Sequence, residues 1–287
     1  MPWPGAAGGP GRTPPAARRP GGPPVSWHDL AVLAVLDPGQ HVAMLDREGR
    51  LLAEVARRTP LDAPVPTCPG WALRQLIAHL GFVHRWAASY VAESREVMVE
   101  EPAEAGVLAL APPDDALLGW FVDGHAALVS TLAGAAPDLR CWTFLPAPSP
   151  LAFWARRQAH ETAVHRVDAE LAAGSTPSPI DPALAADGIE ELLTGFLARK
   201  RRYASGDDSP GTLGLQATDV DLGWTLQVGE LGVEASAGLA ESDCLVRGPV
   251  DDLYLLLWNR RTYDGLETEG SAELLESWRR RFRVTWS

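Results

Sequence analysis

Four long segments with helical periodicity, separated by proline-rich stretches, constrain this chain more than any other feature. Apolar residues recur every three or four positions in residues 38–58, 71–93, 112–132 and 151–173. That spacing places them along one side of an α-helix, where they can be buried together. The prolines and glycines between the segments end each helix. The pattern predicts an antiparallel four-helix bundle.

After residue 177 the pattern changes to a mixture of helices and short alternating strands. The predicted helices are residues 181–203, 250–258 and 272–281, and the predicted strands are residues 211–216, 222–228, 232–236, 244–247 and 282–286. A chain of 287 residues also exceeds the usual size of one domain, about 100 to 200 residues. We therefore expect an α+β protein in which a bundle over residues 38–175 precedes a smaller α+β domain over residues 176–287.

Residues 1–25 consist mainly of Pro, Gly, Ala and Arg and contain no apolar run, so we expect a disordered tail rather than a secretory signal. No segment approaches the roughly 20 consecutive apolar residues that span a membrane. These features predict a soluble protein with no membrane partner.

Net charge and cysteine content argue against several classes of partner and site. The net charge of -12 argues against nucleic acid or an anionic membrane surface as a partner, since both attract basic surfaces. The three cysteines, Cys68, Cys141 and Cys244, are odd in number and far apart, which is unlike a disulfide framework or a cysteine zinc site. A reducing cytoplasm fits this pattern, and nothing in the sequence indicates the oligomeric state.

The hexapeptide His160–His165 carries the strongest chemical signal. Glu161 and His165 are four residues apart, so on a helix they lie one above the other and can reach one metal ion. The zinc-protease signature needs two histidines four apart, but His160 and His165 are five apart. Five residues turn a helix by roughly 140° from its starting direction, which excludes His160 from the same ion. A Glu161/His165 pair remains, and it requires a third ligand.

His79 is the natural third ligand, because it lies in the middle of segment 71–93 on an otherwise apolar face. Glu161 lies at the edge of a buried face, and a buried carboxylate is costly unless it neutralises or meets a cation. A metal ion bound by two imidazoles and this carboxylate would satisfy that need. A hydrogen bond between Glu161 and His79 without any metal is the alternative, and the spacing does not choose between them.

The remaining histidines are weaker candidates. His84 is five residues after His79, hence off its face, and beside Arg85 we expect it to be solvated. His28, His41 and His125 lack this pattern of neighbours, and we expect them to be structural or exposed.

Two further side chains near these motifs have a possible role in the site. Asp168 follows His165 by three residues and could orient its imidazole, although a surface pair with Arg166 or Arg157 is equally consistent with the spacing. Cys68 lies in a tight turn flanked by prolines with no general base beside it. It is expected to be a small buried residue rather than a nucleophile.

Three motifs together resemble the mycothiol-dependent maleylpyruvate isomerase family. They are Val-Pro-Thr-Cys-Pro-Gly-Trp at residues 65–71, Leu-Ile-Ala-His-Leu at residues 76–80 and the segment 157–170 around the hexapeptide. Residues 248–261 are similar to the smaller C-terminal domain of that family, so the resemblance covers residues 38–287. It implies a DinB-like four-helix N-terminal bundle, with His79, Glu161 and His165 as the metal ligands. It also implies a functional arginine, for which Arg260 is the nearest match and Arg261 the next.

The resemblance implies a metal-dependent enzyme that uses a low-molecular-weight thiol, mycothiol, against a small electrophile. Three protein ligands leave one position open on a divalent ion, with zinc the first choice, and that position would hold the thiol as a nucleophilic thiolate. An isomerase of the maleylpyruvate type or a thiol S-transferase would both follow. Arg260 would then bind a carboxylate, while a surface ion pair with Asp264 or Glu267 is its alternative. A metal hydrolase with the same ligands and a non-enzymatic metal-binding or regulatory protein remain the competing functions.

Overall fold

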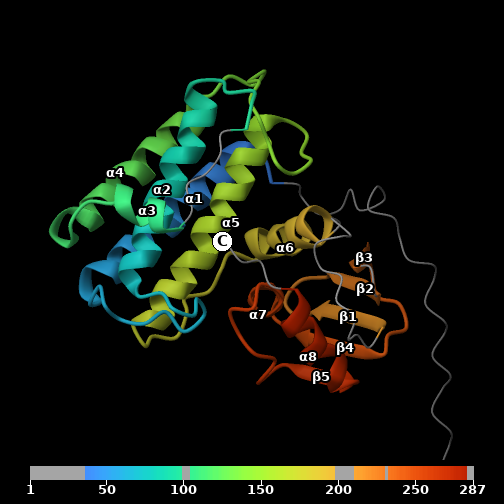
Figure 1. Ribbon diagram of the computed structural model, residues 1–287. Helices are drawn as coiled ribbons and strands as arrows, with labels where there is room; N and C mark the ends of the chain where they lie inside the picture. The colour runs from blue at the N-terminus through green and yellow to red at the C-terminus, as the bar shows by residue number, and fades with distance from the viewer. Residues whose placement is uncertain (1–35, 99–103, 198–209, 230–231, 283–287) are drawn as a thin grey trace, which may run out of the picture.

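The computed structural model describes residues 36–98, 104–197, 210–229 and 232–282. Four long helices, α1 (Pro38–Arg58), α2 (Leu73–Ala92), α4 (Asp114–Ala133) and α5 (Pro150–Ala172), form the bundle (Figure 1). Helix α1 packs mainly on α5, and α2 packs mainly on α4. The predicted bundle followed by a mixed unit is confirmed. A short helix α3 (Glu104–Leu110), which the sequence pattern did not predict, lies between α2 and α4 in the chain.

The helices begin where side chains cap their first turns. Asp37 accepts a hydrogen bond from the backbone N–H of Gln40, whose side chain accepts one in return, and Pro38 occupies the first position of α1. Ser149 and Pro150 play the same parts at the start of α5. A cap oxygen satisfies a backbone N–H that has no partner inside the helix, and proline there has no N–H to lose. These local signals explain why the predicted helix starts fall close to the observed ones.

Helix α5 is the central element of the molecule. Every residue from Phe153 to Glu170 is buried except Arg156, because α1, α2 and the C-terminal unit all lie against it. The polar side chains of α5 therefore point into protein rather than into water. A helix buried on all sides can hold charged groups only if each finds a partner, which is why most of the buried ion pairs among the described residues involve α5.

The C-terminal unit is a five-stranded sheet with helices. Helix α6 (Pro182–Glu190) continues into a π-helical segment, η2 (Glu191–Phe196). The remaining elements are β1 (Gly211–Ala217), β2 (Gly223–Gly229), β3 (Gly232–Ala237), β4 (Cys244–Gly248), α7 (Val250–Leu257), β5 (Glu267–Gly270) and α8 (Ala272–Arg281).

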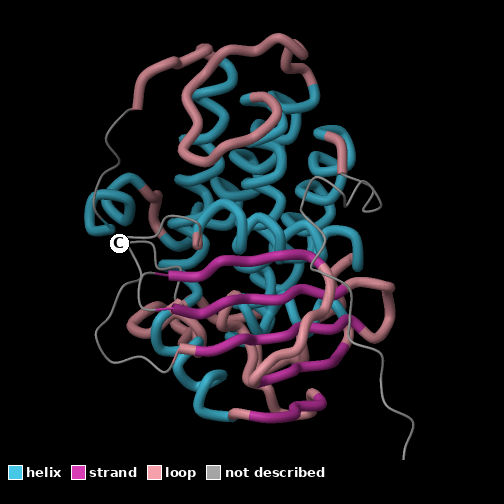
Figure 2. Tube along the Cα trace, turned by 90° about the vertical axis from the view of Figure 1, so that its right-hand side faces the viewer, coloured by secondary structure: helices cyan, strands magenta, loops and turns pink. Residues whose placement is uncertain are grey.

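The strand order is β3-β2-β1-β4-β5, with β1 and β4 parallel and the other pairs antiparallel (Figure 1). Figure 2 shows the strands side by side in one sheet, with most of the helices above it. Helices α7 and α8 pack against β1 and β4. Strand β5 was not predicted. The predicted strand over residues 282–286 and the end of the predicted helix 181–203 fall largely outside the described residues, as does the predicted tail 1–25.

One buried cluster connects the bundle to the sheet. It runs from Phe153 and Trp154 on α5, through Ile189 on α6 and Trp258 after α7, to Trp224 on β2. Figure 1 shows α6 between α5 and the sheet with its helices. Residues of the C-terminal unit are thereby brought against the helix that carries the hexapeptide. The boundary near residue 175 remains a prediction from composition.

Helix α4 is long and apolar enough to meet a length-and-composition test for a membrane span, the single described helix that does so. No such segment was expected from the sequence. The helix packs against α2 and α1 in the bundle, and 33% of its apolar window is buried.

Candidate metal centre

Three sequence-predicted side chains converge between α2 and α5. The Nε2 atom of His79 lies 3.3 Å from Oε1 of Glu161, and Nε2 of His165 lies 3.2 Å from the same oxygen. One ligand atom from each residue falls within 4.8 Å of the other two. Their rings meet edge to face, with 5.2 Å between the centroids of His79 and His165. Two imidazoles and one carboxylate thus surround a single point.

The orientation of Glu161 is set by an arginine on the next turn of α5. Its Oε2 atom accepts a hydrogen bond of 3.1 Å from Arg157, which also pairs with Glu191 at the start of η2. All three side chains are almost completely buried. Arg157 therefore holds one oxygen of Glu161 and leaves Oε1 toward the two histidines.

Asp168 joins the candidate centre to two other parts of the chain. Its Oδ2 lies 2.8 Å from Nδ1 of His165, and its Oδ1 accepts a hydrogen bond of 2.5 Å from the Thr67 hydroxyl. Both Nε and Nη2 of Arg260 donate to its carboxylate at 3.0 Å. Asp168 is fully buried, so the surface pair with Arg166 or Arg157 is wrong and the orienting contact to His165 is present.

Arg260 lies at this centre although it belongs to the C-terminal unit. Its side chain is 9% exposed, and besides Asp168 it donates to the backbone oxygen of Trp258. Its alternative, a surface pair with Asp264 or Glu267, is not found among the contacts of the described residues. Arg261 instead points to Asp252 and to the backbone of Asp264, away from the candidate centre. The planar fork of Arg260 is thus engaged by a carboxylate of the protein itself.

The charges of this cluster support one another. Burial alone would raise the pKa of Glu161, but the imidazoles of His165 and His79 that face its carboxylate, together with the charge of Arg157, hold that pKa well below its ordinary range. Burial opposes ionisation of Asp168 too, yet Arg260 and His165 lower its pKa. Burial lowers the pKa of His165, but the carboxylates of Asp168 and Glu161 raise it more strongly. The result is a pKa of about 9. The site therefore provides two carboxylates that favour a positive charge between them.

Two residues of the loop before α2 complete the surroundings. The indole of Trp71 stacks near His165 at a centroid distance of 6.4 Å and covers His79 at 5.1 Å. The Cys68 thiol lies 3.6 Å from Asp168, and burial together with that carboxylate raises its pKa to about 12. A thiol that stays protonated at neutral pH is a poor nucleophile, in agreement with the expectation from sequence.

Several residues were not assigned to the site from sequence. Thr67, Trp71, Arg157 and Glu191 surround or orient the ligand set. The first three lie in the quoted motifs, which is the only signal that could have indicated them, and Glu191 lies outside every motif. Their roles depend on contacts between distant segments.

The expectation that His84 is solvated is wrong. His84 is fully buried, and its Nε2 lies 3.0 Å from the Thr162 hydroxyl. Burial lowers its pKa well below the ordinary value, so the ring is neutral. His125 is buried near the backbone of Asp46 and is structural, as expected, whereas His28 lies outside the described residues.

The donor set suits a divalent ion of the zinc class. Two imidazole nitrogens and a carboxylate oxygen are ligands that zinc accepts, and three protein ligands leave one position open. Nε2 of His165 is buried and faces Oε1 of Glu161 at 3.2 Å without the geometry of a hydrogen bond, while Nδ1 of the same ring faces Asp168. An imidazole held on one nitrogen by a carboxylate presents its other nitrogen to a metal. The residues present therefore fit the ion.

Two domain families match the sequence. Residues 42–170 match the mycothiol maleylpyruvate isomerase N-terminal domain, and residues 183–277 match the MDMPI C-terminal domain. The first range contains His79, Glu161, His165 and Asp168, and the second contains Arg260. No curated protein sequence gives a significant match.

Solved structures show the same fold. A crystal structure of the mycothiol-dependent maleylpyruvate isomerase has a TM-score of 0.57 and 14% identity, and the match covers 85% of this chain and 95% of that one. A histidine-to-alanine mutant of that enzyme gives a TM-score of 0.58 with the same identity and coverage.

Proposed function

We propose that this chain, which belongs to the mycothiol-dependent maleylpyruvate isomerase family, is a metal-dependent enzyme that uses mycothiol as a thiol nucleophile. It acts on a small electrophile, either as an isomerase of the maleylpyruvate type or as a thiol S-transferase. The observation that carries the proposal is the convergence of His79, Glu161 and His165, with Asp168 and Arg260 behind them.

His79, Glu161 and His165 are the residues that would hold the metal. When bound, a zinc-like ion with an open position lowers the pKa of a coordinated thiol, so that the thiol is ionised at neutral pH. The protein supplies the conditions for this chemistry. Glu161 and Asp168 are ionised and buried, and Trp71 shields one side of the centre.

Asp168 and Arg260 act as positioning residues in this proposal. Asp168 accepts a hydrogen bond from the Nδ1–H of His165 and so holds the ring with Nε2 as the nitrogen that would bind the metal in place of its proton. Arg260 holds Asp168 through two hydrogen bonds and keeps it ionised. The C-terminal unit thereby influences the orientation of a ligand in the bundle.

The test is an assay of the purified chain with maleylpyruvate, with and without mycothiol, and before and after chelation. We expect turnover that requires both the thiol and the metal. Glu161→Gln should lose at least about 100-fold in kcat/KM, since even an outer partner of a metal ligand is worth 10- to 100-fold. Glu170→Gln is the matched control, because Glu170 is equally buried on α5 but pairs with Arg166 and Ser178 instead.

The competing functions give different results in the same assay. A metal hydrolase would turn over ester or amide substrates with metal but without thiol. A metal-binding protein without activity would lose stability on chelation and show no thiol-dependent turnover. A chain that converts maleylpyruvate equally well after complete removal of metal would contradict the proposal.

A further inference from the structure

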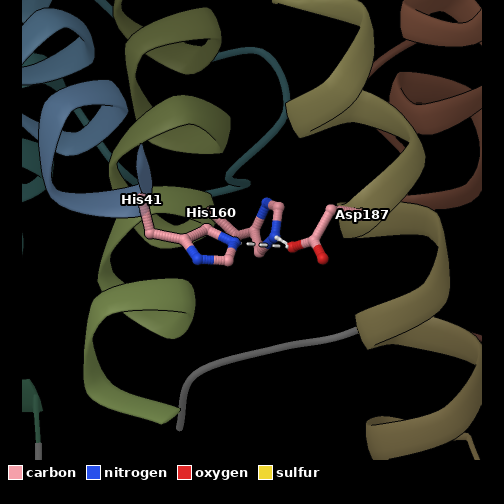
Figure 3. Close-up of side chains that lie close together, drawn as sticks. All are labelled: His41, His160 and Asp187. Atoms are coloured by element: carbon pink, nitrogen blue, oxygen red, sulfur yellow. Dashed lines mark hydrogen bonds and ion pairs between the residues drawn. The ribbon is translucent and has the colours of Figure 1, made fainter. Parts of the chain in front are cut away.

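A second cluster of metal-ligand side chains lies on the other side of α5. His41 from α1, His160 from α5 and Asp187 from α6 point toward one another (Figure 3). The Oδ2 atom of Asp187 lies 2.9 Å from Nε2 of His41 and 2.7 Å from Nε2 of His160. One ligand atom from each residue lies within 4.8 Å of the other two.

We propose that His41, His160 and Asp187 form a second divalent-cation site, distinct from the candidate centre at His79. Two imidazole nitrogens and a carboxylate oxygen form a donor set typical of zinc and other imidazole-compatible divalent ions. The site goes beyond the proposed enzyme function and does not depend on it. His41 also lies just before the matched N-terminal domain, which begins at residue 42.

The cluster is buried yet adjoins a cavity. His41 and His160 are 3% and 0% exposed. A cavity of about 230 Å³, lined by His41 and Asp187 together with Arg156 and Glu190, gives the cluster access from outside. Three protein ligands in a buried position, with a cavity beside them for water, match the requirements of a cation with an open coordination position.

Arg156 contacts the same carboxylate but leaves room for a cation. Its Nε donates to Oδ2 of Asp187 at 2.9 Å, and its Nη2 donates to the backbone oxygen of Asp187 at 2.7 Å. His41, His160 and Arg156 all contact Oδ2 of Asp187, and no hydrogen bond among the described residues goes to Oδ1. A carboxylate has two oxygens and about four acceptor positions, so an ion that replaces the two imidazole contacts can bind while Arg156 stays. Carboxylates that bind metals are usually held by such hydrogen bonds. On the other ligand, Nδ1 of His160 lies 3.5 Å from the Tyr254 hydroxyl.

Helix α5 would then carry ligands for two ions on different faces. Successive residues of an α-helix point about 100° apart, so His160 faces α1 and α6 while its neighbour Glu161 faces α2. The helical geometry that removes His160 from the first site places it in the second. A cation held by α1, α5 and α6 would tie the bundle to the start of the C-terminal unit.

Metal content of the purified full-length chain, equilibrated with excess zinc and then desalted, tests this site. We expect two zinc ions per chain in the wild type. His41→Ala and Asp187→Asn should each lose one equivalent, and His79→Ala should lose the other. His125→Ala is the matched control, since His125 is buried but belongs to neither cluster, and it should keep both ions.

The outcomes separate the two sites. One zinc per chain that is lost in His79→Ala and unchanged in His41→Ala overturns the second site and leaves the proposed function standing. One zinc per chain that is lost only in His41→Ala supports the second site and removes the metal on which the proposed function depends. Two equivalents that persist in both His41→Ala and Asp187→Asn also overturn the proposal, because the second ion would then lie elsewhere.

A thermal measurement keeps the test decisive if a variant folds poorly. In the His79→Ala chain, zinc should raise Tm, because an ion that binds only the folded state stabilises it. The rise should disappear in the chain that carries both His79→Ala and the milder His41→Asn. An equal rise in both chains would contradict the second site. If zinc does not raise the Tm of His79→Ala, the second site is also contradicted. Asp187 then serves only as a shared hydrogen-bond acceptor for the two imidazoles.

Discussion

Asp168 shows how much of the candidate centre depends on one buried carboxylate. It contacts His165 three residues before it, Thr67 in the loop before α2, and Arg260 in the C-terminal unit. The contact to His165 follows from helical spacing and was predictable. The contact to Arg260 joins residues 92 positions apart, and no local pattern specifies it. Sequence spacing therefore predicts contacts between side chains on one helix. Contacts to a charged residue far away in the sequence, such as Arg260, depend on the fold.

At the residue scale, Asp168→Asn should weaken metal binding. The amide carries no charge to balance Arg260 and is a poorer partner for the Nδ1 proton of His165. We expect a 10- to 100-fold loss of zinc affinity, the usual effect of removing an outer partner of a ligand. Competition with a chromogenic chelator measures it.

Asp264→Asn is the control for Asp168→Asn. Asp264 was one of the alternative ion-pair partners of Arg260 expected from the sequence, but its side chain accepts a hydrogen bond from the Thr262 hydroxyl instead. Zinc affinity equal to that of the wild type in Asp168→Asn would show that Asp168 does not orient His165.

Glu190 gives a pH-dependent prediction. Burial is the main cause that raises its pKa from 4.5 to about 7, with Asp187 adding to the rise and Arg156 opposing it. Between pH 4.5 and 7 the folded state therefore binds more protons at this group than the unfolded state, so its contribution to stability falls as pH rises. We expect the Tm difference between Glu190→Gln and the wild type to grow in favour of the variant across this range. A difference independent of pH from 4 to 8 would refute the raised pKa.

At the scale of elements, the helices with local signals were predicted well and the others were not. The observed α1 has the predicted bounds, because its N-cap Asp37 directly precedes the segment and its apolar spacing and final arginines lie within it. Strand β5 was missed because all four of its residues are exposed, so no alternation marks it, and it exists through pairing with β4. The π-helical turn at η2 depends on packing in the same way, and Glu191 at its start pairs with Arg157 on α5.

The sequence pattern also does not predict how closely two helices approach each other. Glycine at position 81 lets α2 approach α4, since a Cβ atom there would lie 2.3 Å from the Trp120 ring. Gly81→Ala should therefore lower the free energy of unfolding by about 1 to 3 kcal/mol, the usual effect of overpacking a filled space. Urea denaturation measures it.

Gly119→Ala is the matched control on the facing helix. No atom lies within 4 Å of a Cβ added at Gly119. Alanine there should raise the free energy of unfolding by about 0.5 to 1 kcal/mol, because glycine costs that much inside a helix. Equal effects of the two substitutions would show that α2 and α4 are not in close contact at Gly81.

At the scale of the whole molecule, the two matched domains build the candidate centre together. The bundle provides His79, Glu161 and His165, and the C-terminal unit provides Arg260 through a core that continues from α5 to the sheet. The α+β class and the three converging side chains were predictable from periodicity and spacing combined with the family resemblance. The engagement of Arg260 by Asp168, and the cluster of His41, His160 and Asp187, were not, because they depend on how α6 and the segment after α7 pack on the bundle.

Anomalous diffraction at the zinc edge, from crystals of the zinc-loaded chain, would locate the ion. We expect an anomalous peak with Nε2 of His79, Oε1 of Glu161 and Nε2 of His165 each about 2.0 to 2.2 Å away. Zinc-loaded crystals with no peak between these three side chains, and with Glu161 still hydrogen-bonded to His79, would contradict it.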